Sequence, residues 1–394
     1  MSAAAGRNAA PGPLRVGIVA GESSGDALGA ALIGALRSLS PSVECFGVAG
    51  PKMIAAGCEA WANSDELAVM GLVEVLHHLP RLLRLRSSLI ARFAAARPDV
   101  FVGIDAPEFN LGLARRLKAR GLRTVQYVSP QVWAWRQGRV RTIGRSCDLV
   151  LCLLPFETDF YARYAVRAEF VGHPLADQIP LDVDRAAARA ALGIRADARL
   201  VALLPGSRVG EVERLGADFA AAAGWISAQR PGIQFIAPMA SVRVRQIFER
   251  QIAGLACGPR ITLIEGQSQR ALAAADAAIV ASGTATLETM LTGRPMVVAY
   301  RLSAITAFLL RTLGMVKVPY FSQPNLLVGR ALVPELLQEQ VTGEALGAAL
   351  LAQTDNAARV AEMTREFRRV HEILRRGGAE RAATAILDFA GRSA

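Results

Sequence analysis

Residues 15–36 read RVGIVAGESSGDALGAALIGAL, in which a short apolar run meets a glycine-bearing turn and then an apolar helical pattern. The run Arg15–Ala20 predicts a buried strand, Gly21–Asp26 predicts the turn, and Ala27–Leu36 predicts a helix. A strand that feeds a helix through a tight turn is the opening unit of a βαβ fold. This stretch therefore predicts a mainly parallel sheet with helices on both faces.

The same alternation of apolar runs and helical patterns extends through both halves of the chain. In the first half the strand candidates are Val100–Ile104, Thr124–Val128, Leu149–Leu153 and, more weakly, Glu169–Val171. The segment His173–Asp184, with two prolines and several acids, is typical of a linker. Beyond it the strand candidates are Leu200–Leu204, Gln234–Ala237, Ile261–Ile264, Ala277–Val280 and Pro295–Ala299.

We therefore predict an α/β protein with two doubly wound, Rossmann-like domains that face a cleft, and a helical C-terminal tail. The expected parts are a disordered tail at 1–13, a first domain at 14–172, a linker at 173–184, a second domain at 185–360 and the helical tail at 361–394. Ligands of such sheets bind at the carboxyl ends of the strands. We expect the functional site in the cleft between the domains.

The composition predicts a protein with a large hydrophobic core and an anionic partner. Of 394 residues 52% are hydrophobic, yet no stretch reaches the about 20 apolar residues that a membrane-spanning helix requires. Five cysteines without a Cys-x-x-Cys pair, together with a start that lacks a signal peptide, predict free thiols in the cytoplasm. The net charge of +11 favours phosphate-bearing or lipid partners, and because nucleic-acid motifs are absent we expect no nucleic acid.

The turn Gly21–Asp26 is a candidate sugar-binding loop. It lacks both Gly-x-Gly-x-x-Gly and Gly-Lys-Ser/Thr, so neither a dinucleotide site nor a Walker loop is supported. Its acids Glu22 and Asp26 would repel a bare pyrophosphate and suit sugar hydroxyls better. We predict acceptor binding by Glu22, Ser24 and Asp26. The alternative is a helix cap in which Ser24 or Asp26 is the acceptor.

Asp105, in the stretch Gly103–Phe109, follows a buried strand and is the candidate general base. A carboxylate beside an apolar strand end is partly desolvated, which raises its pKa and suits it to accept a proton. The alternative is an N-cap, with Pro107 in the first helical turn.

Two turns of the second domain are candidate sites for a nucleotide. In the first turn, Gly206 and Ser207 allow a tight bend at a helix N-terminus, and Arg208 supplies a forked donor for a diphosphate. The alternative for Arg208 is an ordinary exposed arginine. In the second turn the candidates are the small residues Ser282, Gly283 and Thr284, and Glu288 for a ribose diol; the alternative is a capped helix.

The stretch Met70–Ile90 is apolar and largely helical, is kinked or interrupted at Pro80, and carries arginines in its second half. Such a segment can lie on an anionic membrane surface, with Met70, Leu72 and Leu76 as the contact. The alternative is a helix packed in the core.

Together these motifs resemble the lipid-A-disaccharide synthases over nearly the whole chain. The matching stretches, in order, are Gly21–Asp26, Gly47–Pro51, Leu67–Gly71, Gly103–Phe109, Tyr127–Arg136, Pro205–Arg208, Ser282–Glu288 and Pro324–Leu327. The resemblance implies an inverting GT-B glycosyltransferase that joins UDP-2,3-diacylglucosamine to 2,3-diacylglucosamine 1-phosphate, with no metal or other cofactor.

The same resemblance implies roles for single residues. Asp105 would activate the acceptor hydroxyl, Arg208 would steady the UDP diphosphate, and Asn325 would join the nucleotide site. It further implies that the protein acts at the inner face of the cytoplasmic membrane and that a homodimer is possible.

Three other functions are alternatives to this glycosyltransferase. They are a UDP-sugar epimerase, a two-lobed sugar-binding protein, and a peptidoglycan-type N-acetylglucosamine transferase.

Overall fold

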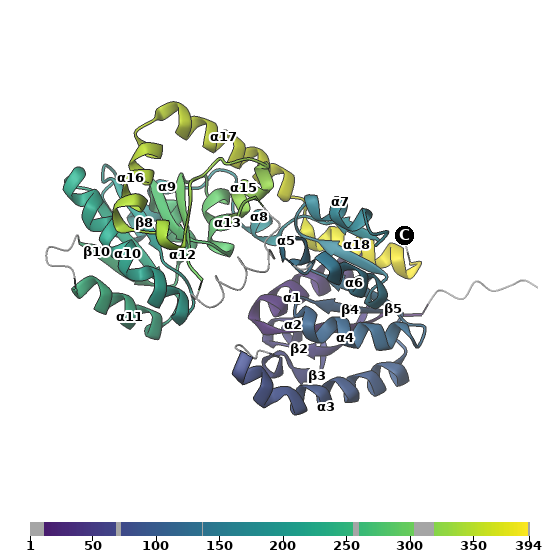
Figure 1. Ribbon diagram of the computed structural model, residues 1–394. Coiled ribbons are helices and arrows are strands. Elements are labelled where there is room, and N and C mark those ends of the chain that lie inside the picture. The colour runs from purple at the N-terminus through teal and green to yellow at the C-terminus, as the bar shows by residue number, and fades with distance from the viewer. Residues whose placement is uncertain (1–11, 68–71, 136, 255–259, 303–318, 393–394) are drawn as a thin grey trace, which may run out of the picture. The chain divides into compact units, whose positions relative to one another are not determined.

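The computed structural model describes residues 12–67, 72–135, 137–254, 260–302 and 319–392. The chain divides into two compact units (Figure 1): Met1–Pro174 together with Arg376–Ala394, and Leu175–Arg375. Each unit holds one parallel sheet with its helices, which confirms the prediction of two doubly wound α/β domains. The predicted tail at 1–13 lies almost wholly outside the described residues.

The sheet of the first unit has seven strands in the order β3-β2-β1-β4-β5-β6-β7, all paired in parallel. The strands are β1 Arg15–Ala20, β2 Glu44–Ala49, β3 Glu59–Asn63, β4 Val100–Ile104, β5 Arg123–Tyr127, β6 Leu149–Cys152 and β7 Ala168–Phe170. The central strands β1 and β4 bury nearly every residue, as the apolar runs in the sequence predict. The order of strands reverses between β1 and β4, which makes this pair the switch point of the sheet.

The helices of the first unit are α1 Glu22–Leu39, α2 Pro51–Ala55, α3 Leu72–Ala96, α4 Pro107–Lys118, α5 Val132–Trp135, α6 Val140–Ser146, α7 Phe156–Ala162 and α18 Gly378–Ala390. For two of them the sequence-based prediction is corrected or narrowed. Helix α1 begins at Glu22, directly after its N-cap Gly21, so Glu22–Asp26 is helical and not a loop. Helix α3 continues through Pro80, where the sequence predicted either a kink or an interruption, so the helix is not interrupted there.

The sheet of the second unit has six strands in the order β10-β9-β8-β11-β12-β13. They are β8 Leu200–Leu204, β9 Gln234–Met239, β10 Ile261–Glu265, β11 Ala277–Ala281, β12 Met296–Tyr300 and β13 Glu335–Leu337. The helices are α8 Pro174–Gln178, α9 Arg185–Ala191, α10 Val209–Gln229, α11 Val242–Ala253, α12 Ser268–Ala274, α13 Thr284–Leu291, α15 Gln323–Val328, α16 Gly343–Thr354 and α17 Ala357–Leu374. The switch point of this sheet lies between β8 and β11.

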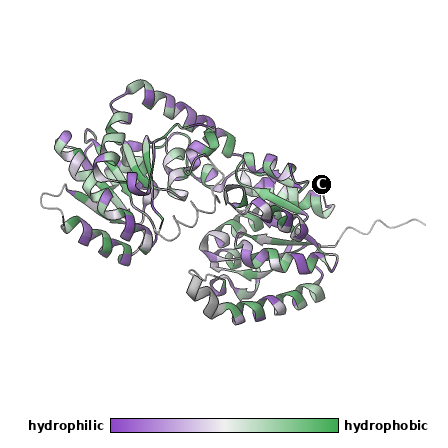
Figure 2. Cartoon of the chain, in the orientation of Figure 1, coloured by the Kyte–Doolittle hydropathy of each residue, from purple (hydrophilic) through white to green (hydrophobic). Residues whose placement is uncertain are grey.

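The C-terminal tail is helical, as predicted, and its last helix returns to the first unit. Helix α18 packs against α1 (Figure 1), and its buried face includes Ala382, Ala383, Ile386 and Ala390. These residues belong to the same core cluster as the strands of the first sheet. Coloured by hydropathy, the strands are mainly green, whereas α17 alternates green and purple along its length (Figure 2).

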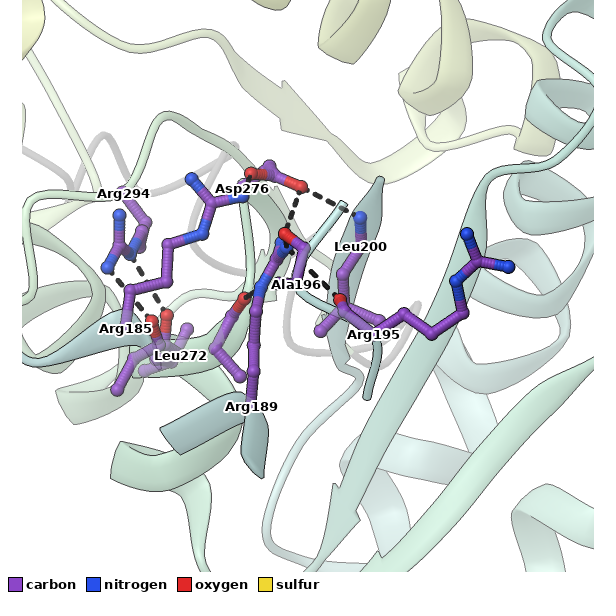
Figure 3. A network of polar contacts seen from close by, with 10 residues as sticks. Arg185, Arg189, Arg195, Ala196, Leu200, Leu272, Asp276 and Arg294 are labelled. Carbon is purple, nitrogen blue, oxygen red and sulfur yellow. Dashed lines mark hydrogen bonds and ion pairs between the residues drawn. The ribbon is translucent and has the colours of Figure 1, made fainter. Parts of the chain in front are cut away.

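The amino-terminal end of the second sheet is held by arginines (Figure 3). Asp276, just before β11, accepts a hydrogen bond from the backbone N–H of Leu200 and pairs with Arg189 and Arg185. Arg189 is only 3% exposed and also donates to the carbonyl oxygen of Ala274, while Arg294 donates to two carbonyl oxygens near the end of α12. Some of the positive charge of the chain therefore serves the fold: these arginines stabilise helix ends and strand starts at the edge of the sheet opposite the candidate site.

Candidate active site

The switch point of the first unit brings the first two sequence motifs together. Strands β1 and β4 pair up to Ala20 and Ile104, so Gly21 and Asp105 follow neighbouring strand ends. A Cβ added at Gly21 would lie 3.0 Å from the Cβ of Ala106, which shows how closely the two turns approach. The parallel sheet thereby places Asp105 where ligands of doubly wound folds bind.

Asp105 has a left-handed backbone, with φ of 51°, and the next residue, Ala106, has φ of 41°. The N-cap of α4 is Ala106 and no side chain caps the helix, so Asp105 does not serve as the cap that was its alternative role. Burial raises the pKa of the Asp105 carboxyl above the usual 3.8, against a smaller opposing effect of the Ala106 N–H. A partly desolvated carboxylate suits a proton acceptor, and burial is the larger of the two effects on the Asp105 pKa.

The three predicted acceptor-binding residues have different surroundings. Glu22 is half-buried at the start of α1, and Ser24 is exposed in its first turn. Asp26 is 3% exposed, and its two oxygens accept hydrogen bonds from the N–H groups of Lys52 at 3.0 Å and Met53 at 2.9 Å. Asp26 therefore stabilises the N-terminus of α2, and this structural role differs from the substrate contact that the sequence suggested.

The switch point of the second unit carries a pocket of about 390 Å³. The candidate residues that line it are Gly206, Ser207, Arg208, Ser282, Gly283, Thr284 and Glu288. They come from two turns, one after β8 and one after β11, and these strands pair up to Leu204 and Val280. Residues far apart in the sequence thus form one concave site of the size that small-molecule ligands occupy.

The turn after β8 holds its backbone N–H groups toward a carboxylate. Glu211 accepts hydrogen bonds from the N–H groups of Ser207 at 3.0 Å and Arg208 at 3.3 Å, and the Arg208 guanidinium lies 3.5 Å from the same side chain. Glu211 is not among the site residues predicted from the sequence. The Arg208 side chain is 65% exposed and its ion pair with Glu211 is long, at 3.5 Å, so the guanidinium can also meet an anion in the pocket.

The turn after β11 is built from small residues above α13. Gly283, the N-cap of this helix, has φ of 149°, which favours glycine. The Ser282 hydroxyl donates to the carbonyl oxygen of Phe321 at 3.0 Å. Glu288 accepts a hydrogen bond from the Ser268 hydroxyl at 3.3 Å, and burial raises the pKa of its carboxyl.

Other pocket residues were not anticipated from the sequence. Ser268 and Gly266 follow β10, and Pro238 and Ala240 lie at the end of β9 and just beyond it. The glycine and serine directly after the predicted strand Ile261–Ile264 repeat the signal of the two recognised turns, and this signal could have identified them.

Asn325 lies outside the pocket lining. It is 1% exposed; its side-chain oxygen accepts from the N–H groups of Leu332 and Val333, and its amide donates to Glu335 at 2.8 Å. Its described contacts fix the segment after α15. A direct contact between Asn325 and a nucleotide stays a prediction.

The candidate membrane contact is described only in part. Met70 lies outside the described residues, and Leu72 and Leu76 belong to the first turns of α3. Farther along this helix Leu79 and Leu83 are 41% and 43% exposed. Among the described helices none is long and apolar enough to cross a bilayer. No group of three metal-binding side chains occurs in the described part of the chain.

Two doubly wound sheets with site residues at their switch points define the GT-B class of glycosyltransferase folds. The solved structure of CalG4, the calicheamicin glycosyltransferase, matches with a TM-score of 0.59 and 17% identity over 96% of this chain and 99% of its own. A UDP-GlcNAc 2-epimerase from Neisseria meningitidis, bound to UDP-GlcNAc, matches with a TM-score of 0.62 and 11% identity over 95% and 98% of the two chains. At such identities the fold alone is shared.

The sequence comparisons identify the family. The model of the family described as lipid-A-disaccharide synthetase matches residues 16–389, and the chain belongs to this family. The lipid-A-disaccharide synthase of Pseudomonas aeruginosa strain UCBPP-PA14 is 52% identical over 96% of this chain and 99% of its own length. That of Serratia proteamaculans is 50% identical over 96% and 98%. The chain is therefore a glycosyltransferase of lipid A biosynthesis, and the epimerase alternative, which has the same fold, is set aside.

Proposed function

We propose that the chain transfers 2,3-diacylglucosamine from UDP to a hydroxyl of 2,3-diacylglucosamine 1-phosphate. The products are a β-linked disaccharide phosphate and UDP, with inversion at the anomeric carbon. Inverting transfer needs a base for the acceptor hydroxyl and positive charge for the leaving diphosphate. The proposal rests mainly on the position of two side chains, each at the switch point of one sheet. The carboxylate of Asp105 follows β4 in the first unit, and the guanidinium of Arg208 follows β8 in the second.

The pocket of the second unit is the proposed donor site. The backbone N–H groups of the turn after β8 already hold a carboxylate, that of Glu211, and a phosphate oxygen presents a similar acceptor. The exposed Arg208 guanidinium and the N-terminus of α10 add positive charge beside them. On the other side of the pocket, Glu288 offers a carboxyl group to the ribose hydroxyls.

Asp105 acts as the base in this proposal. It accepts the proton of the acceptor hydroxyl while that oxygen attacks the anomeric carbon, and the bond from this carbon to the UDP oxygen breaks. Partial burial supports the role because it raises the proton affinity of the carboxylate. As the bond breaks, negative charge grows on UDP, and Arg208 offsets that charge.

Because both proposed substrates carry acyl chains, we expect the protein to act at a membrane surface. Leu79 and Leu83 are exposed on α3, and arginines lie beside them on the same helix. We propose that this helix, with Met70, Leu72 and Leu76 near its start, contacts the cytoplasmic face of the inner membrane. Apolar side chains would enter the headgroup region, and arginines would meet anionic lipid. The homodimer stays a prediction.

The test is UDP release by the purified full-length protein in detergent. Both acyl sugars are supplied together, and the donor is also supplied alone. We expect acceptor-dependent UDP release and a disaccharide phosphate by mass spectrometry. If the donor sugar is epimerised without acceptor, or if no UDP is released with either substrate set, the proposal is wrong.

Arg208→Ala tests the donor half separately. Loss of a charge-assisted contact that strengthens as the bond breaks should lower kcat by about 10²–10³-fold. Gln substitution of the nearby exposed Glu213 in α10 is the matched control, because it changes charge on the same helix away from the pocket lining.

A further inference from the structure

Three residues at adjoining strand ends of the first unit have backbones that side-chain-bearing residues rarely adopt. Asp105 and Ala106 follow β4, and Val128 follows β5, with φ angles of 51°, 41° and 77°. A β-branched residue such as Val128 is especially unfavourable there. Such backbones persist where the surrounding structure enforces them, and they gather at functional sites.

Asn110, in α4, is the first group that enforces them. Its side chain is fully buried, and its amide nitrogen donates to the carbonyl oxygen of Asp105 at 2.9 Å. The same nitrogen lies 3.2 Å from the carbonyl oxygen of Ile104 and 3.3 Å from that of Val19. One amide thus holds the ends of β1 and β4 together with the first left-handed peptide.

Gln126, in β5, approaches the same peptide from the neighbouring strand. It is also fully buried, and its amide nitrogen donates to the carbonyl oxygen of Asp105 at 3.1 Å. The nitrogen lies 3.3 Å from the carbonyl oxygen of Val128 and 3.4 Å from that of Tyr127. The Asp105 carbonyl therefore accepts hydrogen bonds from two buried amides on two different elements.

The side-chain oxygens of Asn110 and Gln126 indicate a role beyond folding. The side-chain oxygens of Asn110 and Gln126 are buried and find no hydrogen-bond partner among the described residues, an arrangement that costs folding free energy. Gly103 leaves the space for both: a Cβ there would lie 2.9 Å from the Cβ of Asn110 and 3.2 Å from the side-chain oxygen of Gln126. Two amide donors thus converge on the Asp105 carbonyl although each leaves its own side-chain oxygen unpaired, and this convergence points to a need beyond folding.

We propose that Asn110 and Gln126 form an amide clamp that positions Asp105 for proton transfer. The two donors fix the Asp105 peptide in its left-handed conformation, and the carboxylate is thereby held at one place beside the substrate. Neither amide touches the substrate, so both are positioning residues. The proposal rests on the proposed function, in which Asp105 is the base.

Two shape-preserving variants test the clamp in the full-length enzyme. Gln126→Met keeps the length of the side chain and Asn110→Leu approximates its shape, and both remove the donors and the unpaired oxygen. We expect kcat to fall about 10- to 100-fold, since a shift near 1 Å at a reacting group costs this much. The KM for each substrate and the Kd for UDP should stay within about twofold, because neither amide touches a substrate and the donor pocket is built by the other unit.

Thr124→Val is the matched control for a purely structural role. Thr124 is a fully buried polar residue two positions earlier in β5, and its hydroxyl bonds Asp148 at 2.9 Å, away from the strand end. This variant should lower the melting temperature and leave kcat unchanged. If Gln126→Met fails to fold, Gln126→Asn replaces it; the shortened amide withdraws the donor and should still lower kcat with KM unchanged.

Three results separate the possibilities. Wild-type kcat in Gln126→Met and Asn110→Leu, with an inactive Asp105→Asn, would overturn the clamp while keeping Asp105 as the base. A fall in kcat that only follows lost stability, with KM and UDP affinity changing alongside, would also overturn it. Full activity of Asp105→Asn would instead refute the proposed function on which the clamp rests.

Discussion

At the scale of single residues, Asp105 combines a left-handed backbone with a carboxyl whose pKa is raised by burial. Asp105→Asn keeps the shape and removes the base, so kcat should fall by about 10²–10⁴-fold. UDP affinity should not change, because the described pocket belongs to the other unit. The measurement is turnover and UDP binding by calorimetry on the same preparation. Weakened UDP binding in this variant would contradict the separation of roles.

The raised pKa of Asp105 also predicts the pH dependence of the reaction. The base must be ionised, so kcat/KM should rise with pH through the folded-state pKa and then level off. Because burial raises that pKa, the acid limb should lie above the 3.8 of an ordinary aspartate. A pH–rate profile between the stability limits of the enzyme checks this. If the apparent pKa of the acid limb is 3.8 or lower, the Asp105 carboxyl is solvated and its pKa is not raised.

Glu157 provides a residue-scale prediction about stability. It is buried in α7, accepts hydrogen bonds from the Trp133 indole and the Leu154 N–H at 3.0 Å each, and burial raises its pKa from 4.5 to about 7. The folded state therefore holds a proton that the unfolded state releases near pH 4.5. The contribution of the Glu157 carboxyl to the free energy of unfolding is therefore complete below pH 4.5 and is lost as the pH rises to about 7.

Glu157→Gln removes this titration. The substitution leaves a mismatched amide against one of the two N–H donors, so the variant should be less stable than the wild type at pH 5. The difference in melting temperature should narrow between pH 5 and pH 8, as the wild type loses the contribution of its protonated carboxyl. A difference that stays constant over this range would mean that Glu157 has an ordinary pKa.

At the scale of elements, the turn between β8 and α10 depends on Gly206. Its φ is 136°, and an added Cβ would lie 2.5 Å from the Cβ of Glu211. Gly206→Ala must therefore shift the turn, at a cost of about 1–3 kcal/mol, and move the N–H groups of Ser207 and Arg208, two residues of the pocket lining. We expect UDP affinity to fall roughly 10- to 100-fold, as calorimetry would measure.

Gly210→Ala is the control for this turn. A Cβ there meets only the flexible end of Arg214, at 3.1 Å, and the residue lies inside α10. It should leave UDP affinity unchanged and slightly stabilise the helix. Equal losses in both variants would indicate a general disturbance of α10 instead of the turn.

The elements also show how far the sequence predicts this structure. Strands β1, β4 and β8 have the predicted bounds because each is a short run of mainly apolar residues. Strands β2, β3 and β13 were missed: β3 and β13 are short, partly exposed strands at the edges of their sheets, whereas β2 is mostly buried and could have been recognised. The turns of the donor pocket could be predicted, since glycine and hydroxyl residues follow apolar runs.

Contacts between distant residues could not be predicted in the same way. Gln126 binds the backbone of Asp105, which lies 21 positions away, and Asp26 caps a helix that begins 25 positions later at Pro51. Neither contact leaves a periodic signal, because each depends on the order of strands in the sheet. The resemblance to a family supplied the substrates, which local patterns alone did not.

At the scale of the whole molecule, the return of α18 to the first unit couples the end of the chain to the core that supports Asp105. Ile386 is fully buried in that core, whereas Thr384 of the same helix is exposed, and its hydroxyl donates to the carbonyl oxygen of Glu380 one turn earlier. Ile386→Ala should destabilise the first unit by about 2–5 kcal/mol. Thr384→Ala is the control and should change stability little.

Calorimetry with and without UDP can assign this loss to one unit. UDP raises the melting temperature of the unit that binds it, so a UDP-sensitive transition reports the second unit. Ile386→Ala should lower the transition that UDP does not shift and leave the UDP-sensitive one in place. If the variant lowers only the UDP-sensitive transition, α18 stabilises the donor half and its assignment to the first unit is wrong. If one cooperative transition responds to both UDP and the substitution, the two units unfold together, and the C-terminal helix then governs the stability of both substrate sites.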